Sequence, residues 1–396
     1  MVDTSLSVIL STIGESTQRG WGQSTPAEGP QRVTYDALNQ NMVPLIAAQQ
    51  LGLGVGQKIC AVKNMAVSGV GTTGQLQSVV VDAMGVSRNG PMRSVNVAAA
   101  QSQLVLITLG TNDAYDGIPV ALFMDRIRAL VINELRLGRR IFIQLPPAIR
   151  GVGVTYRDGQ TLKTEPSTGE MLSCQQLLER YAQELVKSQL GTIIPRPTEQ
   201  SMADAFHPTN VHYTAMAAEV VKVIGPQLDR FNVEYQVALL YTSVFRRAVE
   251  ASALDFWGGA LLRGQLRFQD GTLATELLKS SPYLTASLTN EQFVDAVYRF
   301  DFGRVPKVSE ISFWAGALNN GRTRGSILTD MLTSCATYQQ AGGTDVAGLK
   351  SQRLILNRTA VALSRGAIYR QDTLDPAYPN GVLAQVTDDP NTAYWS

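Results

Sequence analysis

Short apolar runs rich in β-branched residues alternate with amphipathic stretches through the first 230 residues of this chain of 396. Five of the runs have the length of buried strands, and they lie at 6–13, 58–67, 104–109, 140–145 and 192–194. Three stretches between them have helical spacing, at 36–51, 120–137 and 172–188. Parallel strands are joined by crossovers, usually helices, so the alternation predicts a parallel sheet with helices on both faces. Residues 150–169 lack a clear period and are expected to form a long loop.

The pattern changes after about residue 229, where helical spacing replaces strand-like runs. A repeat with an offset of 57 residues begins there, in which Tyr241, Arg247, Trp257 and Gly264 recur as Tyr298, Arg304, Trp314 and Gly321. Repeated short units predict an all-α C-terminal domain. The expected organisation is an α/β domain at 1–231, tandem helical repeats at 232–340, and a final helix with an irregular tail at 341–396.

Composition argues against several classes of partner. Hydrophobic residues make up 44% of the chain and charged residues 17%, which is enough for a large core. The net charge is +1 and basic residues form no stripe interleaved with aromatics, so no nucleic acid partner is expected. No apolar run reaches the length of a membrane span. Cys60, Cys174 and Cys335 are too far apart for a metal site or a disulfide framework, so we expect ordinary thiols.

The first residues predict no signal peptide. Residues 1–4 carry no positive side chain, and the apolar run that follows is short and leads directly into a serine motif. We therefore expect an extracellular or virion-associated protein that leaves the cell by a route without a signal. A cytoplasmic location is the alternative.

Four short motifs follow predicted strands or lie in the last loop of the α/β part. They are Gly14-Glu15-Ser16-Thr17, Val67-Ser68-Gly69, Gly110-Thr111-Asn112-Asp113 and Asp204-Ala205-Phe206-His207. Together they supply a serine, a backbone amide, an asparagine amide, and an aspartate three residues before a histidine. Acyl transfer needs a nucleophile, oxyanion donors, a general base and a group that orients the base. Ligands bind at the carboxyl ends of strands in open α/β sheets, so the placement favours one common site.

Each motif taken alone has a structural explanation. A serine after a glycine is a common helix cap, Asn-Asp is a common turn, and single glycines and aspartates mark many turns. The hypothesis of a site therefore depends on the four motifs together. A glycine-rich run at 52–56 suggests a nucleotide loop, but it precedes a strand and lacks the P-loop lysine, so nucleotide binding is not expected.

The chain has two histidines, and His207 is the better candidate for the base. Asp204 is close enough in sequence for its carboxylate to reach Nδ1, which leaves Nε2 for a serine. Pro208 disfavours helix at His207 and suits the first turn of a helix that follows. His212 has no acid at comparable spacing and is expected inside that helix, in a packing role.

These motifs resemble those of the SGNH hydrolases, also called the GDSL-like esterase and lipase family, over about residues 5–228. By this resemblance Ser16 is the nucleophile, His207 the base and Asp204 its partner. The oxyanion donors are then the amide of Ser16, Gly69 and Asn112.

The resemblance implies a flavodoxin-like three-layer α/β/α sandwich with a parallel sheet, and it implies neither a metal nor a cofactor. One position departs from the family pattern. Glu15 stands where the family has aspartate before the serine. The longer side chain keeps the charge but changes the turn, so it bears on the catalytic rate more than on the fold.

The repeated units resemble a bacterial helical domain of unknown function that is similar to phycobilisome linker repeats. The pattern Tyr-x5-Arg, followed by Phe-Trp and Leu-x2-Gly, carries this resemblance. The simplest role of Tyr241, Arg247 and Trp257 is packing between helices. The alternative is a contact surface at 232–340 for a surface glycan or a structural protein.

The leading hypothesis is a serine esterase that removes small acyl groups, acetyl above all, from a carbohydrate or polysaccharide. A lipase or thioesterase is the alternative within enzymes. A phage tail, capsid decoration or surface adhesive protein with an SGNH-like domain, active or degenerate, is the alternative outside enzymes. A virion protein that deacetylates host polysaccharide would combine both hypotheses.

Overall fold

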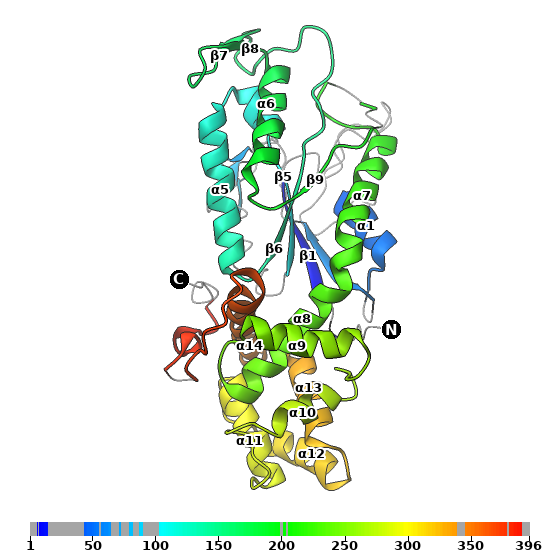
Figure 1. Cartoon of the computed structure of the whole chain (residues 1–396), viewed down its shortest axis with the longest axis vertical. Helices are drawn as coiled ribbons and strands as arrows, with labels where there is room; N and C mark the ends of the chain where they lie inside the picture. The colour runs from blue at the N-terminus through cyan, green and yellow to red at the C-terminus, as the bar shows by residue number, and fades with distance from the viewer. Residues whose placement is uncertain are drawn as a thin grey trace.

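The computed structural model describes residues 6, 8–14, 43–54, 57–64, 71–72, 79–81, 87–89, 103–198, 201–202, 205–338, 345–377 and 380–389. They form an α/β part and an all-α part that lie end to end along the longest axis (Figure 1). The predicted fold class, a parallel α/β sandwich followed by a helical region, is confirmed.

Five parallel strands form the central sheet in the order β2-β1-β5-β6-β9. Their bounds are Val8–Gly14 for β1, Ile59–Asn64 for β2, Leu104–Thr108 for β5, Arg140–Gln144 for β6 and Thr192–Ile194 for β9. Numbered along the chain, this is the 2-1-3-4-5 order of flavodoxin-like folds. β1 and β5 are neighbours in register at their carboxyl ends, where Gly14 pairs with Thr108.

Two pairs of helices cover the sheet, one pair on each face (Figure 1). α1 (Val43–Leu51) and α7 (Asn210–Ile224) lie on one face, and α5 (Val120–Arg136) and α6 (Cys174–Ser188) lie on the other. Successive residues of β5 alternate between the two cores, so that Leu106 packs with the first pair and Ile107 with the second. Both faces are covered, which explains why β5 is apolar from Leu104 to Ile107.

Smaller elements complete the α/β part. β3 (Val79–Val81) pairs with β4 (Ser87–Asn89), β7 (Lys163–Thr164) pairs with β8 (Met171–Leu172), and α4 (Thr111–Asp116) follows β5. Of the loop predicted at 150–169, only β7 has regular structure. The helix predicted at 172–188 begins at Cys174, because Ser173 and Gln176 form a capping box. Residues 36–42 and 65–67, predicted as parts of a helix and a strand, lie outside the described residues.

The described residues of the all-α part form seven α-helices. They are α8 (Leu228–Phe245), α9 (Ala251–Leu262), α10 (Thr272–Leu278), α11 (Asn290–Asp301), α12 (Val308–Asn319), α13 (Arg324–Ala336) and α14 (Val346–Leu363). A short turn of 3-10 helix, Gly225–Gln227, joins α7 to α8, and a π-helical turn, Ser364–Ile368, extends α14. None of the helices in the described ranges is both long and apolar enough to cross a membrane.

The 57-residue repeat is visible as two matched sets of aromatic contacts. The guanidinium of Arg247 lies 5.0 Å from the ring centre of Tyr241, and that of Arg304 lies 4.7 Å from Tyr298. In both units the Phe-Trp pair packs edge to face with ring centres 4.9 Å apart. Helices α8, α9 and α10 therefore correspond to α11, α12 and α13. Both tyrosines are 4% exposed, which agrees with the predicted packing role.

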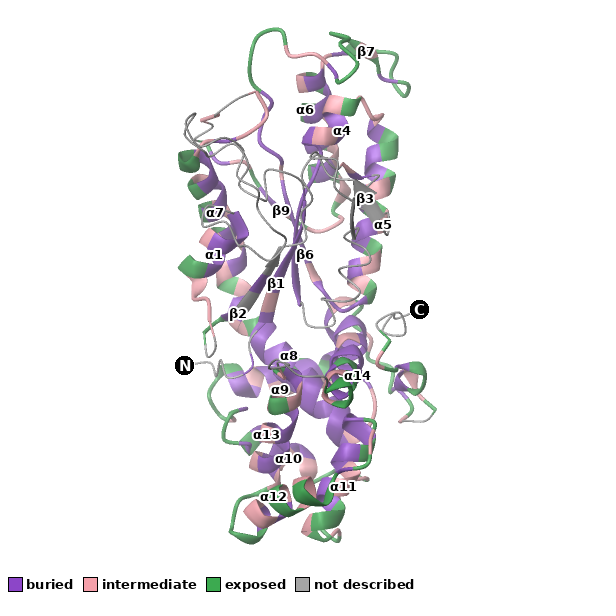
Figure 2. Cartoon of the chain, turned by 180° about the vertical axis from the view of Figure 1, so that it is seen from behind, coloured by how far each residue is buried: buried purple, intermediate pink, exposed green. Residues whose placement is uncertain are grey.

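α8 runs beneath the amino ends of the strands and is buried along almost its whole length (Figure 2). Asn232 satisfies two backbone groups there: its Oδ1 accepts from Val8 N at 2.9 Å, and its Nδ2 donates to Lys58 O at 3.1 Å. Gln236 Nε2 donates to Leu6 O at 3.2 Å. The all-α part is therefore attached at the edge of the sheet opposite the carboxyl ends of the strands. The domain boundary expected near residue 231 falls in the first turn of α8. The division of the chain into 1–231, 232–340 and 341–396 therefore remains a proposal.

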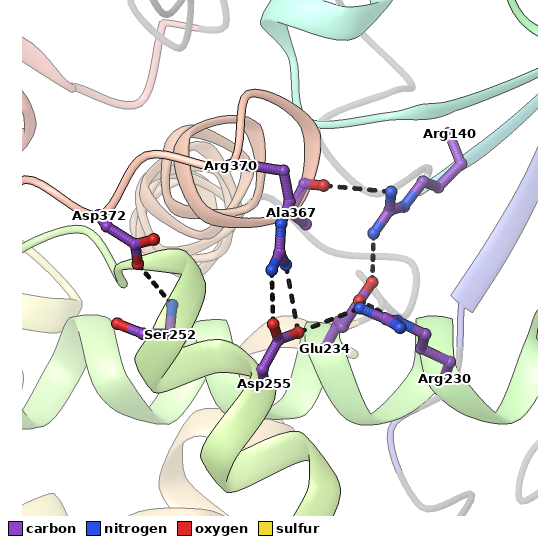
Figure 3. Close-up of polar contacts among 8 residues, drawn as sticks. All are labelled: Arg140, Arg230, Glu234, Ser252, Asp255, Ala367, Arg370 and Asp372. Carbon is purple, nitrogen blue, oxygen red and sulfur yellow. Dashed lines mark hydrogen bonds and ion pairs between the residues drawn. The ribbon is translucent and has the colours of Figure 1, made fainter.

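A network of charged side chains joins the two parts beside α8 (Figure 3). Arg140, at the start of β6, donates to Glu234 of α8. Glu234 also accepts from Arg230 at 2.7 Å, and Arg230 lies 3.1 Å from Asp255 of α9. Arg370, which follows the π-helical turn, donates to both oxygens of Asp255. The sheet, two helices of the repeat and the C-terminal segment thus meet in one set of ion pairs.

Part of the tail packs against both halves. Leu383, in the 3-10 turn Val382–Gln385, is fully buried with Leu137 at the end of α5 and Val361 of α14. Asp375 is 2% exposed, and its Oδ2 accepts from Ala248 N at 3.1 Å. The described part of the tail therefore packs on a surface formed by α5, α14 and the segment that follows α8.

Asp301, at the end of α11, is 3% exposed within the all-α part. Ser243 Oγ donates to its Oδ2 at 2.8 Å. Burial raises the pKa of the Asp301 carboxyl from 3.8 to about 6, although the Ser243 bond and the charges of Arg358 and Arg246 oppose the rise. The acid is therefore more easily protonated in the folded chain than in the unfolded one.

Replacement of Asp301 by asparagine is expected to flatten the pH dependence of unfolding between about pH 4 and 6. In this window the folded chain keeps a proton that the unfolded chain has released, so the free energy of unfolding falls as the pH rises. The fall amounts to roughly 3 kcal/mol for a shift of about two pKa units. Thermal melting of both forms from pH 4 to 7 measures it, and equal slopes would contradict this account.

Candidate active site

Two of the predicted site residues, Ser16 and Asn112, follow neighbouring parallel strands in the sequence. β1 ends at Gly14, two residues before Ser16, and β5 ends at Thr108, four residues before Asn112. Asn112 and His207 are described by the structure. Ser16, Gly69 and Asp204, with Glu15, lie outside the described residues, so their positions stay predictions.

Asn112 is the second residue of α4 and is half-buried. The chain turns from β5 into this helix at Gly110, whose φ of 129° is in the region that favours glycine. A Cβ at Gly110 would also lie 3.3 Å from Leu178 Cδ1 of α6. The sharp turn holds Asn112 just past the end of β5, which is where the sequence predicts an oxyanion donor.

Asp113, the next residue, ties α4 to the chain that follows β2. Its two carboxylate oxygens accept from Thr72 N, each at 3.0 Å, and Thr72 Oγ1 donates to Oδ1 at 2.6 Å. A Cβ on Gly71 would lie only 2.9 Å from the carboxylate. Burial raises the pKa of Asp113, although the bonds from Thr72 oppose the rise. The contact brings residues close in sequence to Gly69 against the helix that carries Asn112.

Sequence reasoning did not assign Asp113 this role. One feature of the sequence could have indicated it: Asp113 directly follows the predicted oxyanion donor. A carboxylate just past a strand end readily accepts hydrogen bonds from backbone N–H groups. Its partner Thr72 gave no clue in the sequence.

His207 lies on a closed loop before α7 and is half-buried. Thr209 caps α7 by accepting from His212 N at 3.4 Å, and its own N donates to Ser201 O at 3.0 Å. Met202 and Pro208 form an antiparallel bridge across the loop. His212 lies inside α7 as predicted, fully buried, with Nδ1 3.2 Å from Ser201 O. These contacts fix both ends of the segment that carries His207.

An aromatic pair joins α4, which carries Asn112, to the loop that carries His207. The rings of Tyr115 and Phe206 pack edge to face with centres 5.0 Å apart, at 60°. Tyr115 is three residues after Asn112, and Phe206 directly precedes His207. Such pairs add about 0.5–1.5 kcal/mol to the burial of their area. The structure therefore brings the two described site residues to the same end of the sheet.

The loop 150–169 borders both of these segments. Arg157 N donates to Tyr115 O at 2.8 Å, and its guanidinium lies 5.0 Å from the Tyr115 ring and 2.5 Å from Asp116. Arg150 N donates to Ala205 O at 2.9 Å, two residues before His207. Among the described residues, no group of three or more His, Cys, Asp or Glu is placed to hold a metal ion.

Comparison with known proteins agrees with this architecture. A family model described as GDSL-like Lipase/Acylhydrolase matches residues 10–220, which is more than half of the chain. The chain belongs to the GDSL-like lipase/acylhydrolase family. The resemblance on which the site residues were predicted is therefore confirmed for the acylhydrolase domain, although the match does not test the individual residues. A second model, of a domain of unknown function (DUF4214), matches residues 274–338.

Solved structures similar to the acylhydrolase domain include several esterases. A carbohydrate acetylesterase family member from Sinorhizobium meliloti is 17% identical, with a TM-score of 0.40, and the match covers 56% of this chain and 99% of that one. A family two carbohydrate esterase from Clostridium thermocellum, in complex with cellohexaose, is 18% identical, with a TM-score of 0.37 and coverage of 56% and 64%. The aryl esterase of M. smegmatis is 17% identical, with a TM-score of 0.39 and coverage of 55% and 98%. A search of curated proteins finds none that matches this chain.

Proposed function

We propose that the α/β part is a serine esterase that hydrolyses small acyl esters, acetyl above all, on a carbohydrate. Ser16 is the nucleophile, His207 the general base and Asp204 the group that orients it. The amides of Ser16 and Gly69 and the side chain of Asn112 bind the oxyanion. One observation supports this most directly: the Tyr115–Phe206 contact joins the segments that carry the oxyanion donor and the base.

The reaction divides into two acyl transfers. Ser16 Oγ attacks the ester carbonyl while His207 takes the hydroxyl proton, and the oxyanion receives hydrogen bonds from the three donors. The tetrahedral intermediate collapses, and His207 gives the proton to the departing sugar oxygen. A water molecule, deprotonated by His207, then attacks the acyl-serine. The bond between the acyl carbon and Ser16 Oγ breaks, His207 returns its proton to Oγ, and the carboxylic acid leaves.

The carbohydrate part of the proposal is supported by the polarity of the described surface around α6. A groove lies there between α6 and the chain that leaves β6 and β9, and it is lined mainly by charged and amide side chains. A lipase or long-chain thioesterase needs an apolar cleft for its acyl chain. The polar groove favours a hydroxyl-rich alcohol and a short acyl group.

Labelling with a serine-reactive phosphonate, combined with turnover of p-nitrophenyl esters, tests the proposal. We expect hydrolysis of p-nitrophenyl acetate to exceed that of the octanoate, and we expect one phosphonate label, on the peptide that contains Ser16. Ser16→Ala should take no label and should lack turnover. A label that persists in Ser16→Ala would exclude Ser16 as the nucleophile.

A further inference from the structure

A groove with a volume of about 730 Å³ runs along α6 beside the chain that leaves β6 and β9. One wall is the outer side of α6, and the other is formed by residues 148–150 after β6 and by Arg196 after β9. The volume is within the range of small-molecule sites, about 300–1,000 Å³. No step of the proposed chemistry uses this groove.

The side chains along the groove are polar, and several are held in place. Arg196 Nη1 donates to both carboxylate oxygens of Glu179, at 2.6 and 2.7 Å, and Arg196 Nε donates to Pro146 O at 2.5 Å. Arg180 pairs with Glu170 at 2.7 Å. These planar guanidinium and carboxylate groups already have fixed orientations, so a ligand that bonds to them needs little ordering of the protein.

Glutamine side chains supply the remaining polar surface. Gln175 Nε2 donates to Gly151 O at 3.0 Å, and Gln176 is fixed by its capping box with Ser173. Gln183 lines the groove one helical turn beyond Glu179 and is exposed. Each amide offers both donors and acceptors, which is the pattern that a ligand rich in hydroxyl groups requires.

The apolar residues of the groove are largely covered. Ile149 is 5% exposed and Leu172 is 7% exposed, and both belong to the core under α5 and α6. These two side chains therefore offer little surface of their own to an acyl chain. The groove therefore suits a polyhydroxylated ligand better than a hydrocarbon one.

The groove adjoins the segment that carries His207. Arg150, which lines it, donates its backbone N–H to Ala205 O at 2.9 Å, two residues before the histidine. The carbonyl of Gly151 accepts the bond from Gln175. A Cβ added at Gly151 would lie 3.8 Å from Ala205 Cβ, so the two segments are close together. A chain of sugars whose ester is at the carboxyl edge of the sheet would leave the site along this wall.

We propose that this α6 groove is a glycan subsite that binds sugar residues next to the one that carries the ester. The inference rests on the proposed esterase function and adds the direction in which the polysaccharide lies. It also makes the preferred substrate an acetylated oligomer instead of an acetylated monosaccharide.

Kinetics on substrates of different length test the subsite. We measure kcat and KM of the full chain for p-nitrophenyl acetate, acetylated glucose and an acetylated gluco-hexasaccharide. The unchanged enzyme should have a higher kcat/KM for the hexasaccharide than for the monosaccharide. Gln183→Ala and Gln175→Ala should each raise KM for the hexasaccharide by about 3–10-fold, the loss expected for one or two hydrogen bonds. Turnover of p-nitrophenyl acetate should not change.

Glu184→Ala is the matched control, because Glu184 is adjacent to Gln183 but lines the separate groove between α5 and α6. It should leave all three substrates unaffected. Equal kcat/KM for the monosaccharide and hexasaccharide, or glutamine variants that behave like Glu184→Ala, would overturn the subsite. Loss of p-nitrophenyl acetate turnover in the glutamine variants would also overturn it, since the effect would then be structural. Failure of the unchanged enzyme on p-nitrophenyl acetate would instead reject the esterase function itself.

Discussion

Alanine at His207 is expected to lower kcat for p-nitrophenyl acetate by about 10⁴-fold. The serine hydroxyl is a poor nucleophile until a base removes its proton, and no other histidine in the chain is placed for that task. KM should change little, because the imidazole acts mainly on the transition state. Steady-state kinetics of the purified variant give both constants.

The fold should tolerate this substitution. His207 is only half-buried, and its loop is closed by backbone contacts: the bond from Thr209 N to Ser201 O at 3.0 Å and the bridge between Met202 and Pro208. Neither contact needs the imidazole. The melting temperature of His207→Ala should therefore stay close to that of the unchanged chain, which separates lost chemistry from lost structure.

His212→Asn is the control, since it changes the other histidine and keeps a donor. The Ser201 carbonyl can only accept, so Nδ1 of His212 donates to it, and an asparagine amide can replace that bond. We expect kcat close to that of the unchanged enzyme. If His212→Asn loses activity and His207→Ala keeps it, the assignment of the base is wrong.

Local patterns in the sequence were enough to predict the strands and the helices that cover them. A strand buried on both faces must be apolar throughout, and this is visible within one run such as 104–109, which contains β5. The differences concern element ends and the short elements β3, β4, α4, β7 and β8, which were not predicted. The start of α6 depends on the capping box of Ser173 and Gln176, which fixes the first turn two residues later than the apolar spacing indicated.

Contacts between distant segments were not predictable in this way. α8 was recognised as helical, but nothing local indicated that Asn232 would bond to the backbone of two strands. The repeat shows the same limit. Arg247 pairs with Glu250, three residues on, and Arg304 pairs with Glu310, six residues on. The 57-residue spacing identified the arginines and the tyrosines. The glutamate that pairs with each arginine has no glutamate at the matching position of the other unit.

The site shows what motif reasoning can and cannot give. It predicted Asn112 and His207 as site residues, and the structure shows a contact between Tyr115 and Phe206, which lie close to them in the sequence. It did not identify the carboxylate of Asp113 as a link to the chain after β2, because that role depends on where Thr72 lies in space.

Alanine at Glu134 is expected to have the largest effect on stability, lowering the free energy of unfolding by about 3–5 kcal/mol. Glu134 of α5 forms an ion pair with Arg139, and both side chains are 1% exposed. Removal of one partner leaves the other charge in a site without access to water, which is why such a deletion costs more than a lost surface pair. Urea unfolding, followed by circular dichroism, measures the change.

Glu184→Ala provides the comparison, because it makes the same change in the neighbouring helix α6. Its partner Lys187 is 66% exposed, so this pair should contribute less than about 1 kcal/mol. Replacement of both buried partners, as in Glu134→Leu with Arg139→Met, should recover much of the loss. A Glu134→Ala variant no less stable than Glu184→Ala would show that the buried charge finds another partner.

The Glu134–Arg139 pair lies close to contacts between the α/β part and the all-α part. Its loss should therefore lower the stability of both parts. Between its two members lies Gly138, with a φ of 71°, where a Cβ would be 2.3 Å from Ala360 O of α14. Ser364 Oγ donates to Leu135 O at 2.9 Å, and the residue after Arg139 is Arg140, which reaches Glu234 of α8. Because the end of α5 is held against α14 and the start of β6 against α8, loosening this segment should weaken the helical part as well. Glu134→Ala should therefore lower the unfolding midpoints of both parts together, and a shift confined to the α/β part would show that the two unfold independently.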